Sequence, residues 1–281
     1  MNTKHLFCGF LLLLLATVAS QATAQTKAAP LVIGETFTIA SKILGETRRI
    51  NVYLPAGYAE TPTLRLPVLY MPDGGLAEDF LHVAGLVQVG VGNNTMRPFI
   101  LVGIENTQRR RDLTGPTTVA EDKKIAPKVG ESVAFRKFIR QELMPQVQHR
   151  YRTTPEKAIV GESLAGLFVV ETLLLEPDLF DHYLAFDPSL WWNNEQLVSQ
   201  AAATIKAYKG PAKTLFMTSS DEPVIAAASA RLAKILQDTP NPALTWHYES
   251  MPTETHGTIY HPSALRGFRY VFKPAPESAT K

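Results

Sequence analysis

The feature that most constrains the fold is the stretch at residues 158–168, Ala-Ile-Val-Gly-Glu-Ser-Leu-Ala-Gly-Leu-Phe. A short apolar run ends at Ser163, and a second apolar segment of helical character begins at once. This order predicts a buried strand, a sharp turn and a helix, in which the serine oxygen stands clear of the backbone. Gly161 leaves room for strand and helix to approach closely. The Leu164 amide lies at the helix start, where it can donate to a negative charge.

The turn departs from the common G-x-S-x-G spacing at its last position. Ala165 takes the place of the second glycine, which follows one residue later at Gly166. Alanine is still small enough for such a turn, so the pattern favours a nucleophilic serine. From this pattern alone the alternative is an ordinary strand-to-helix turn that carries a surface serine.

The amino-terminal segment has the pattern of a cleaved signal peptide over residues 1–24. Lys4 precedes an apolar run over residues 6–18, and a small-x-small pattern predicts cleavage after Ala24. The apolar run is short for a membrane span, so the alternative, an uncleaved anchor, is less favoured. We therefore expect a periplasmic or secreted protein with no membrane span once this segment is removed.

The rest of the chain, residues 25–281, is long enough for a single large α/β domain. Its charges nearly balance, with 28 basic and 26 acidic residues in the whole sequence and no long basic block, so nucleic acid is not an expected partner. The one cysteine, Cys8, lies in the predicted signal peptide, which leaves the mature chain without disulfides. The oligomeric state stays open.

The order of elements predicts the fold class. Two alternating segments, 36–40 and 49–54, read as antiparallel strands, and buried strands then alternate with helices through the rest of the chain. This indicates a mostly parallel central sheet with helices on both faces and an antiparallel amino-terminal edge. Residues 114–130 lack a hydrophobic period and are long for a connection, which suggests a lid or binding loop. The tail from 274 is expected to fray.

Polar residues at the predicted strand ends give a possible catalytic set. Ser163 is followed later by Asp221 and Glu222 after another strand, and then by His256 after the last one. The order serine, acid, histidine is that of α/β-hydrolases. Such a histidine takes the serine proton, and the carboxylate orients the ring.

Each of these positions has an alternative. We prefer Glu222 as the acid, with Asp221, which can instead cap the next helix, and Asp187 as rivals. We prefer His256 as the base over two other histidines of structural appearance, His247 and His261. For the oxyanion, the expected amide donors are Leu164 and, from a Gly-rich turn after a buried strand, Gly74 or Gly75.

Several motifs together resemble one known family. They are listed here in chain order: Ser41-Lys42-Ile43-Leu44-Gly45-Glu46, Val52-Tyr53-Leu54-Pro55, Asp73-Gly74, Asn106-Thr107 with Arg109, Arg111 and Asp112, Gly161-x-Ser163-x-x-Gly166, Pro188-Ser189-Leu190-Trp191-Trp192 and Glu254-Thr255-His256-Gly257. The chain resembles the esterases of the α/β-hydrolase superfamily that include the enterobactin and salmochelin esterases. The resemblance implies an α/β-hydrolase fold, Ser163 as nucleophile and His256 as base. It departs at Glu162, where histidine is common, and at Asp187, where serine is common.

These observations lead to one expected function and two alternatives. We expect an exported serine hydrolase of a small-molecule carboxylic ester or lactone, with siderophore-type esters among the candidate substrates, that needs no metal or organic cofactor. The expected substrate-binding residues are Asp73, Arg109, Arg111, Trp191 and Trp192. The first alternative is an acyltransferase or thioesterase that uses the same acyl-enzyme. The second is a non-catalytic binding protein on a hydrolase scaffold.

Overall fold

A computed structural model describes residues 28–274, and all of its helices and strands lie in a compact unit that begins at Gly34. The predicted signal peptide and all but the first residue of the predicted tail lie outside the described residues. The strands are β1 (Glu35–Ser41), β2 (Glu46–Tyr53), β3 (Leu66–Pro72), β4 (Ile100–Ile104), β5 (Thr153–Glu162), β6 (His182–Phe186), β7 (Lys213–Ser219) and β8 (Leu244–Ser250).

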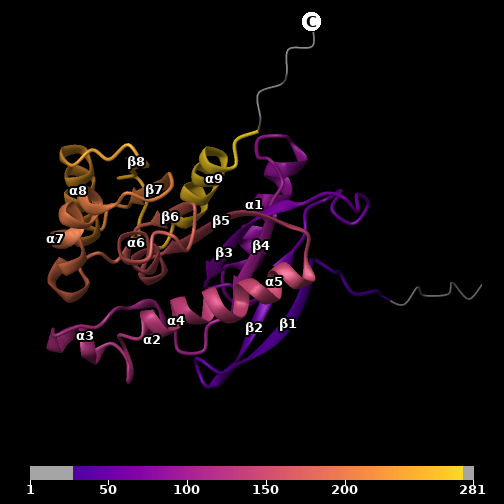
Figure 1. Cartoon of the computed structure of the whole chain (residues 1–281), viewed down its shortest axis with the longest axis horizontal. Coiled ribbons are helices and arrows are strands. Elements are labelled where there is room, and N and C mark those ends of the chain that lie inside the picture. Colours follow the sequence, from indigo (N-terminus) through magenta and orange to yellow (C-terminus); the bar gives the residue numbers. More distant parts are fainter. Residues whose placement is uncertain (1–27, 275–281) are drawn as a thin grey trace, which may run out of the picture. The chain divides into compact units, whose positions relative to one another are not determined.

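The strands form one eight-stranded sheet in the order β1-β2-β4-β3-β5-β6-β7-β8 (Figure 1). Strands β1 and β2 pair antiparallel, as do β2 and β4, and every later pair is parallel. The predicted class, a mostly parallel sheet with an antiparallel amino-terminal edge, is confirmed. Strand β5 therefore has β3 on one side and β6 on the other, which decides what lies beside Ser163.

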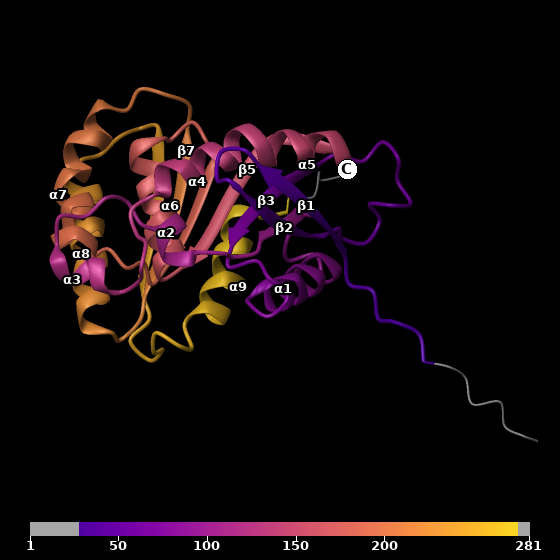
Figure 2. The same cartoon turned by 90° about the horizontal axis from the view of Figure 1, so that it is seen from below.

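The helices cover both faces of the sheet (Figure 2). They are α1 (Phe80–Gly92), α2 (Arg109–Leu113), α3 (Ala120–Lys124), α4 (Ser132–Phe138), α5 (Met144–Arg150), α6 (Leu164–Leu175), α7 (Trp192–Ala207), α8 (Pro223–Asp238) and α9 (Tyr260–Val271). Helices α1 and α9 pack on one face, around a cluster that includes Phe99, Phe268 and Phe272. Helices α4 to α8 pack on the other face around a larger core. No helix among residues 28–274 is both long and apolar enough to cross a membrane.

Burial explains the near-continuous apolar runs of the central strands. Every residue of β3 and β4 is buried, because helices cover both sides of these strands. By contrast, β1 at the sheet edge alternates exposed and buried side chains over most of its length. Central strands are therefore apolar at nearly every residue, whereas the edge strand β1 alternates polar and apolar residues.

Two connections differ from a simple reading of the sequence. The apolar residues over 131–150 have a helical period, but the structure interrupts this helix with a π-helical turn, Ile139–Leu143, between α4 and α5. Pro145 lies in the first turn of α5, where its missing N–H is tolerated. The long connection at 114–130 contains α3 and is anchored to the segment around α7. The indole of Trp192 donates to the Gly115 carbonyl (2.9 Å), and the Asn193 amide donates to Asp122 (2.8 Å).

Candidate active site

Ser163 lies in a sharp turn between β5 and α6, as the sequence predicts. Its backbone angles are φ 59° and ψ −120°, a conformation that few non-glycine residues adopt. The turn is held by its own backbone: the Ser163 amide donates to the Phe186 carbonyl (3.0 Å), and the Ser163 carbonyl accepts from Leu167 and Ser189. The neighbouring strand β6 thus helps to fix the strained residue.

Close packing explains why the shifted glycine spacing is tolerated. A Cβ on Gly161 would lie 2.5 Å from the backbone of Ala165, so strand and helix meet here without space for a side chain. A Cβ on Gly166 would lie 2.9 Å from the Phe186 carbonyl oxygen, so this position also needs glycine. Ala165 itself is fully buried between these contacts.

His256 lies beside Ser163 in the loop between β8 and α9. Its Nε2 is 3.1 Å from the Ser163 Oγ, within hydrogen-bond distance, and its side chain is 42% exposed. The two rival histidines lie elsewhere. His247, in β8, stacks on Phe216 of β7, and a ring nitrogen of His261 lies 2.8 Å from a ring nitrogen of His82. The structure therefore brings together the serine and the histidine that the sequence analysis prefers.

Asp187 is the carboxylate that orients the His256 ring. Its Oδ2 lies 2.6 Å from His256 Nδ1, and it also accepts hydrogen bonds from the amide (2.6 Å) and the hydroxyl (2.7 Å) of Ser220. The side chain is fully buried, and its residue has a positive φ of 44° after β6. These donors satisfy the buried charge and fix its direction toward the ring. The hydrogen bond to Asp187 raises the pKa of His256, although burial of the ring opposes this.

Glu222, the preferred acid of the sequence analysis, is not the hydrogen-bond partner of His256. It precedes Pro223 at the start of α8, and both it and Asp221 are exposed. The reason is the strand order: Glu222 follows β7, two strands from β5, whereas Asp187 follows β6, the direct neighbour of β5. The rival Asp187 takes the place that was expected for Glu222.

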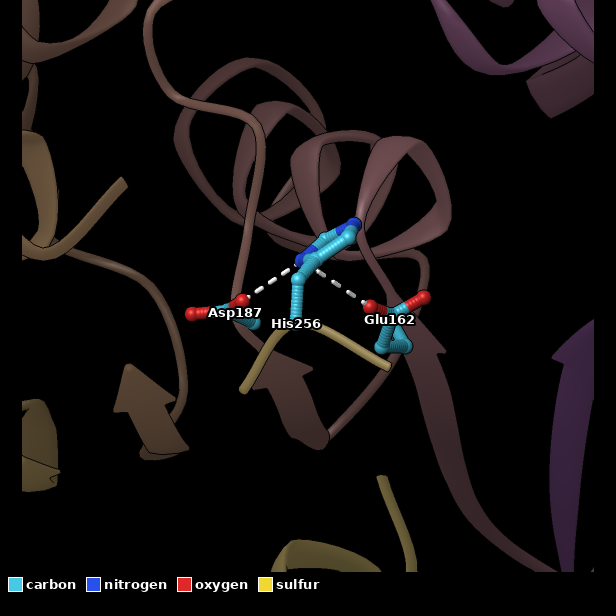
Figure 3. Close-up of side chains that lie close together, drawn as sticks. All are labelled: Glu162, Asp187 and His256. Carbon is cyan, nitrogen blue, oxygen red and sulfur yellow. Dashed lines mark hydrogen bonds and ion pairs between the residues drawn. The ribbon is translucent and has the colours of Figure 1, made fainter. Parts of the chain in front are cut away.

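Glu162 is a second carboxylate at the same ring nitrogen. Figure 3 shows Asp187 and Glu162 approaching His256 Nδ1 from two sides, with Glu162 Oε1 3.4 Å away. Burial is the largest influence on Glu162 and raises its pKa to about 7. The nearby charges of Asp187 and Asp73 add to the rise, and those of His256 and Arg109 oppose it. The sequence analysis noted Glu162 only as a departure from the common histidine.

Glu162, Asp187 and His256 are also the three-residue group of metal-ligand type found among residues 28–274. A metal ion held at ~2.1 Å by Nδ1 and a carboxylate oxygen in tetrahedral geometry would separate those two atoms by roughly 3.4 Å. Nδ1 and Asp187 Oδ2 are only 2.6 Å apart, which is the distance of a charge-assisted hydrogen bond. The arrangement therefore fits a proton on Nδ1 better than a metal ion.

The amides of Gly74 and Gly75 are both engaged, which corrects the expected oxyanion donors. The Gly74 amide donates to the Ile104 carbonyl (3.0 Å), and the Gly75 amide donates to Glu78 Oε2 (2.7 Å). Asp73 precedes them with a positive φ of 59° at the end of β3, the other neighbour of β5. Within the described chain, neither the Asp73 amide nor the Leu164 amide donates to a protein acceptor. One of the two free amides thus lies at the end of β3, and the other lies at the start of α6.

The expected substrate-binding residues separate into two groups. Arg111 is buried in an ion-pair cluster with Glu46 and Asp112, and Trp192 is buried under the 114–130 connection, so both have structural contacts. Arg109 and Trp191 are partly exposed. Arg109 makes two hydrogen bonds to the carboxylate of Asp73 (2.7 and 2.8 Å).

Sequence reasoning missed two serines of this site. Ser189 places its hydroxyl 3.4 Å from that of Ser163, and Ser220 donates twice to Asp187. Ser189 follows β6, the neighbour of β5, in a Pro-Ser segment, and Ser220 follows β7 in a Ser-Ser segment. Only the strand order would have singled them out, because serine is common in such loops.

Residues 41–260 match the family model described as Putative esterase. The ferri-bacillibactin esterase of Bacillus subtilis is 30% identical over 168 residues, which cover 53% of this chain and 56% of that protein. The siderophore triacetylfusarinine C esterase of Aspergillus fumigatus is 30% identical over 177 residues, 59% of each protein. The matches thus span little more than half the length of these curated relatives.

Solved structures show the same fold. An IroE-like serine hydrolase from Shewanella oneidensis is 28% identical with a TM-score of 0.79, and the match covers 85% of this chain and 80% of that one. The siderophore hydrolase EstB from Aspergillus nidulans, at 22% identity and a TM-score of 0.76, covers 89% of this chain and 98% of that one. The family match covers most of the chain and agrees with the observed fold and with the resemblance noted from the motifs. The chain therefore belongs to the Putative esterase family.

Proposed function

We propose that this protein is a serine-dependent hydrolase of small-molecule carboxylic esters or lactones. One observation carries the proposal: a continuous line of contacts runs from Ser163 Oγ through both ring nitrogens of His256 to the buried carboxylate of Asp187. A serine hydroxyl is a weak nucleophile that needs such a base, and the base needs a group that fixes its tautomer. The family match supports ester hydrolysis as the reaction.

The first half of the reaction forms an acyl-enzyme. Ser163 Oγ attacks the ester carbonyl carbon while its proton moves to His256 Nε2. The Nδ1–H of the ring stays hydrogen-bonded to Asp187, which stabilises the imidazolium that results. As the tetrahedral intermediate collapses, Nε2 returns the proton to the leaving alkoxide, and the alcohol departs.

The negative oxygen of the tetrahedral intermediate needs donors that no protein group already uses. The Leu164 amide at the start of α6 and the Asp73 amide at the end of β3 fit this requirement. The first also lies at the amino-terminal end of a helix, where the helix dipole favours negative charge. Leu164 is thus kept from the sequence analysis, and the Asp73 amide replaces Gly74 and Gly75 in our assignment.

Hydrolysis completes the cycle. Water donates a proton to His256 Nε2 as its oxygen attacks the acyl carbon. When the second tetrahedral intermediate collapses, Nε2 gives this proton to Ser163 Oγ, which releases the acid and restores the free serine. The exposed fraction of the His256 side chain, 42%, gives water access to this nitrogen.

The proposed substrate class rests on the relatives. A cavity of about 730 Å³ between α7 and α8 has Trp191 in its wall, but its two basic side chains, Arg231 and Lys234, are already paired with Glu195 and Asp238. The charges of this cavity therefore do not select an acidic ester. Because the relatives are named as siderophore esterases, siderophore-type esters and lactones are the first substrates to test.

Purified protein tests the proposal directly. We expect turnover of an aryl acetate and of at least one lactone or siderophore-type ester, and a loss of about 10³-fold or more in Ser163→Ala. Ser189→Ala is the matched control, because it removes a hydroxyl 3.4 Å away without removing the nucleophile. Equal rates for wild type and Ser163→Ala would reject the serine mechanism.

Export is a separate part of the proposal and rests on residues 1–24 alone. Amino-terminal sequencing of the protein from a bacterial periplasmic fraction should give a chain that begins at Gln25. A chain that still begins at Met1 in every fraction would reject export.

A further inference from the structure

The structure places two carboxylates, not one, against the ring nitrogen that faces away from Ser163. Asp187 arrives from the end of β6, and Glu162 arrives from the last position of β5 (Figure 3). Their distances to His256 Nδ1 are 2.6 Å and 3.4 Å. Glu162 is also the residue directly before the nucleophile, so the strained turn that exposes Ser163 fixes the position of this carboxylate.

The two carboxylates differ in how their charges are satisfied. Asp187 has hydrogen-bond donors for both of its oxygens, from Ser220 and His256. Glu162 Oε1 is buried and has no hydrogen-bond partner among the described residues. A buried carboxylate oxygen without a donor is costly unless a cation faces it. The His256 ring, when protonated, is the cation that faces Glu162.

The other charged groups around Glu162 do not supply that cation in full. Arg109 attracts it, but the guanidinium of this residue is already bound through two hydrogen bonds to Asp73. Asp187 and Asp73 repel it. The titratable and charged groups that bear on Glu162 or on the His256 ring are Asp73, Arg109, Asp187, Glu222 and Tyr260, while Asp79 acts on Arg109 and Tyr260. Most of them are acidic or neutral, so a positive ring is the main compensation available.

We propose that Glu162 is a second positioning carboxylate for His256, which stabilises the charge that the ring gains in the reaction and partly replaces Asp187 when that residue is lost. This inference rests on the proposed function, because it assumes that His256 takes a proton from Ser163. It assigns to Glu162 a role that depends on its charge. A role in packing alone would depend only on its shape.

The consequence is a defined dependence on pH. Burial raises the pKa of Glu162 to about 7, so the side chain is neutral in acid and ionised above neutrality. In acid, wild type and Glu162→Gln carry the same charge at this position and should react at equal rates. Above neutrality only the wild type has the second negative charge, and it should be faster.

Kinetics across pH form the first arm of the test. We expect the ratio of kcat/KM between wild type and Glu162→Gln to be near one at low pH and to rise to about 3–10-fold at high pH, an aryl ester being the substrate. Glu222→Gln is the matched control, since it also removes one negative charge that acts on the ring but makes no contact with it. Its ratio should change less. A ratio that is constant across the pH range, or equal effects of the two variants, would overturn the proposal.

A double-mutant cycle forms the second arm. In the Asp187→Asn background Glu162 is the remaining carboxylate at Nδ1, so Glu162→Gln should cost several-fold more there than in the wild type, on the order of 30-fold or above. Equal costs in the two backgrounds would show that Glu162 does not replace Asp187.

A third arm is independent of catalysis. NMR titration of the His256 ring should give a lower pKa in Glu162→Gln than in wild type, with a smaller decrease in Glu222→Gln. If Ser163→Ala turns over esters like the wild type, the proposed function fails, while this titration still tests the contact between Glu162 and the ring. An unchanged His256 pKa in Glu162→Gln would overturn the inference even in an active esterase.

Discussion

Two clusters of charged side chains in this protein contrast in how they balance charge. The first, here the edge cluster, consists of Arg48, Arg111, Asp112 and Glu46 near the antiparallel edge of the sheet. Its two arginines face its two carboxylates, and Arg48, Arg111 and Asp112 are buried. Burial alone would raise the pKa of Glu46, but hydrogen bonds from Arg111 and Thr107 and the charge of Arg48 outweigh it and lower the pKa to about 2.

The second, here the triad cluster, consists of Glu162, Asp187 and His256. It has two carboxylates for one ring that is positive only when protonated. The pKa of its outer carboxylate, Glu162, is raised to about 7, opposite to the shift of Glu46.

The contrast distinguishes a cluster with structural contacts from the one that we propose to be reactive. In the edge cluster every charge is matched, so the cluster holds loops and strands together and has little reason to move a proton. In the triad cluster the excess carboxylate is relieved when the ring takes a proton, which is the step that a general base must perform. The number of cations that face the carboxylates thus distinguishes the edge cluster from the triad cluster.

The largest expected effect is on the triad cluster. Asp187→Asn should lower kcat by about 10³–10⁴-fold, because the ring loses the acceptor that fixes its tautomer. Glu222→Gln should cost less than about 3-fold, since its side chain does not contact the ring. Steady-state kinetics on an aryl ester check both, with circular dichroism as the control for folding. The reverse ranking would return Glu222 to the position of triad acid.

The edge cluster should respond in stability and not in chemistry. Arg48→Met removes one of the two arginines that face the buried Asp112 and leaves Arg111 to balance two carboxylates, so it should destabilise the fold by about 3–5 kcal/mol, the typical cost of breaking a buried ion pair. Urea unfolding measures the loss, and kcat per folded molecule should stay close to that of wild type. A large drop in kcat without a loss of stability would place the edge cluster in the active site.

Glu46→Gln tests the lowered pKa of the edge cluster. A folded-state pKa of about 2 contributes stability that is present above the unfolded value near 4.5 and is lost as the pH falls toward 2. The variant should therefore be less stable than wild type by about 1–3 kcal/mol at pH 7, with the gap closing in acid. Equilibrium unfolding at several pH values tests this, and a gap that is independent of pH would contradict it.

Glu162→Gln should change the pH dependence of stability in the opposite direction. A folded-state pKa raised to about 7 gives stability that is fully present below about 4.5 and is lost as the pH rises through 7. The neutral variant should match wild type in acid and exceed its stability by about 1–3 kcal/mol above pH 8. The same unfolding series measures it. A variant that is less stable than wild type at high pH would show that the ionised carboxylate is well compensated after all.

Much of the fold could be predicted from the sequence, because buried strands and helices have apolar residues in a regular pattern. The apolar runs of β3 and β4 and the turn at Ser163 identify the sheet and its elbow. The order of the strands in the sheet has no comparable local pattern in the sequence. Without it, Glu222 after β7 looked as close to His256 as Asp187 after β6, and the rule that the acid can be Asp or Glu did not separate them.

The same limit applies to the smaller groups of the site. A Gly-rich turn suggests free amides, but the Gly74 amide donates to Ile104 at the end of β4 and the Gly75 amide donates to Glu78, while the preceding Asp73 amide has no acceptor among the described residues. The sequence analysis placed Arg111 among the substrate-binding residues, but this side chain is paired and buried. Such outcomes depend on pairings between distant segments, which spacing along the chain does not encode.

The most direct test of the account is to trap the acyl-enzyme. An activated phosphonate or a slowly hydrolysed aryl ester should label the protein once per chain, and peptide mass spectrometry should find the label on Ser163. Labelling should be lost in Ser163→Ala, strongly slowed in Asp187→Asn and nearly unchanged in Glu222→Gln. A label on another residue, or hydrolysis without any label on Ser163, would contradict the proposed nucleophile and the catalytic line from Ser163 through His256 to Asp187.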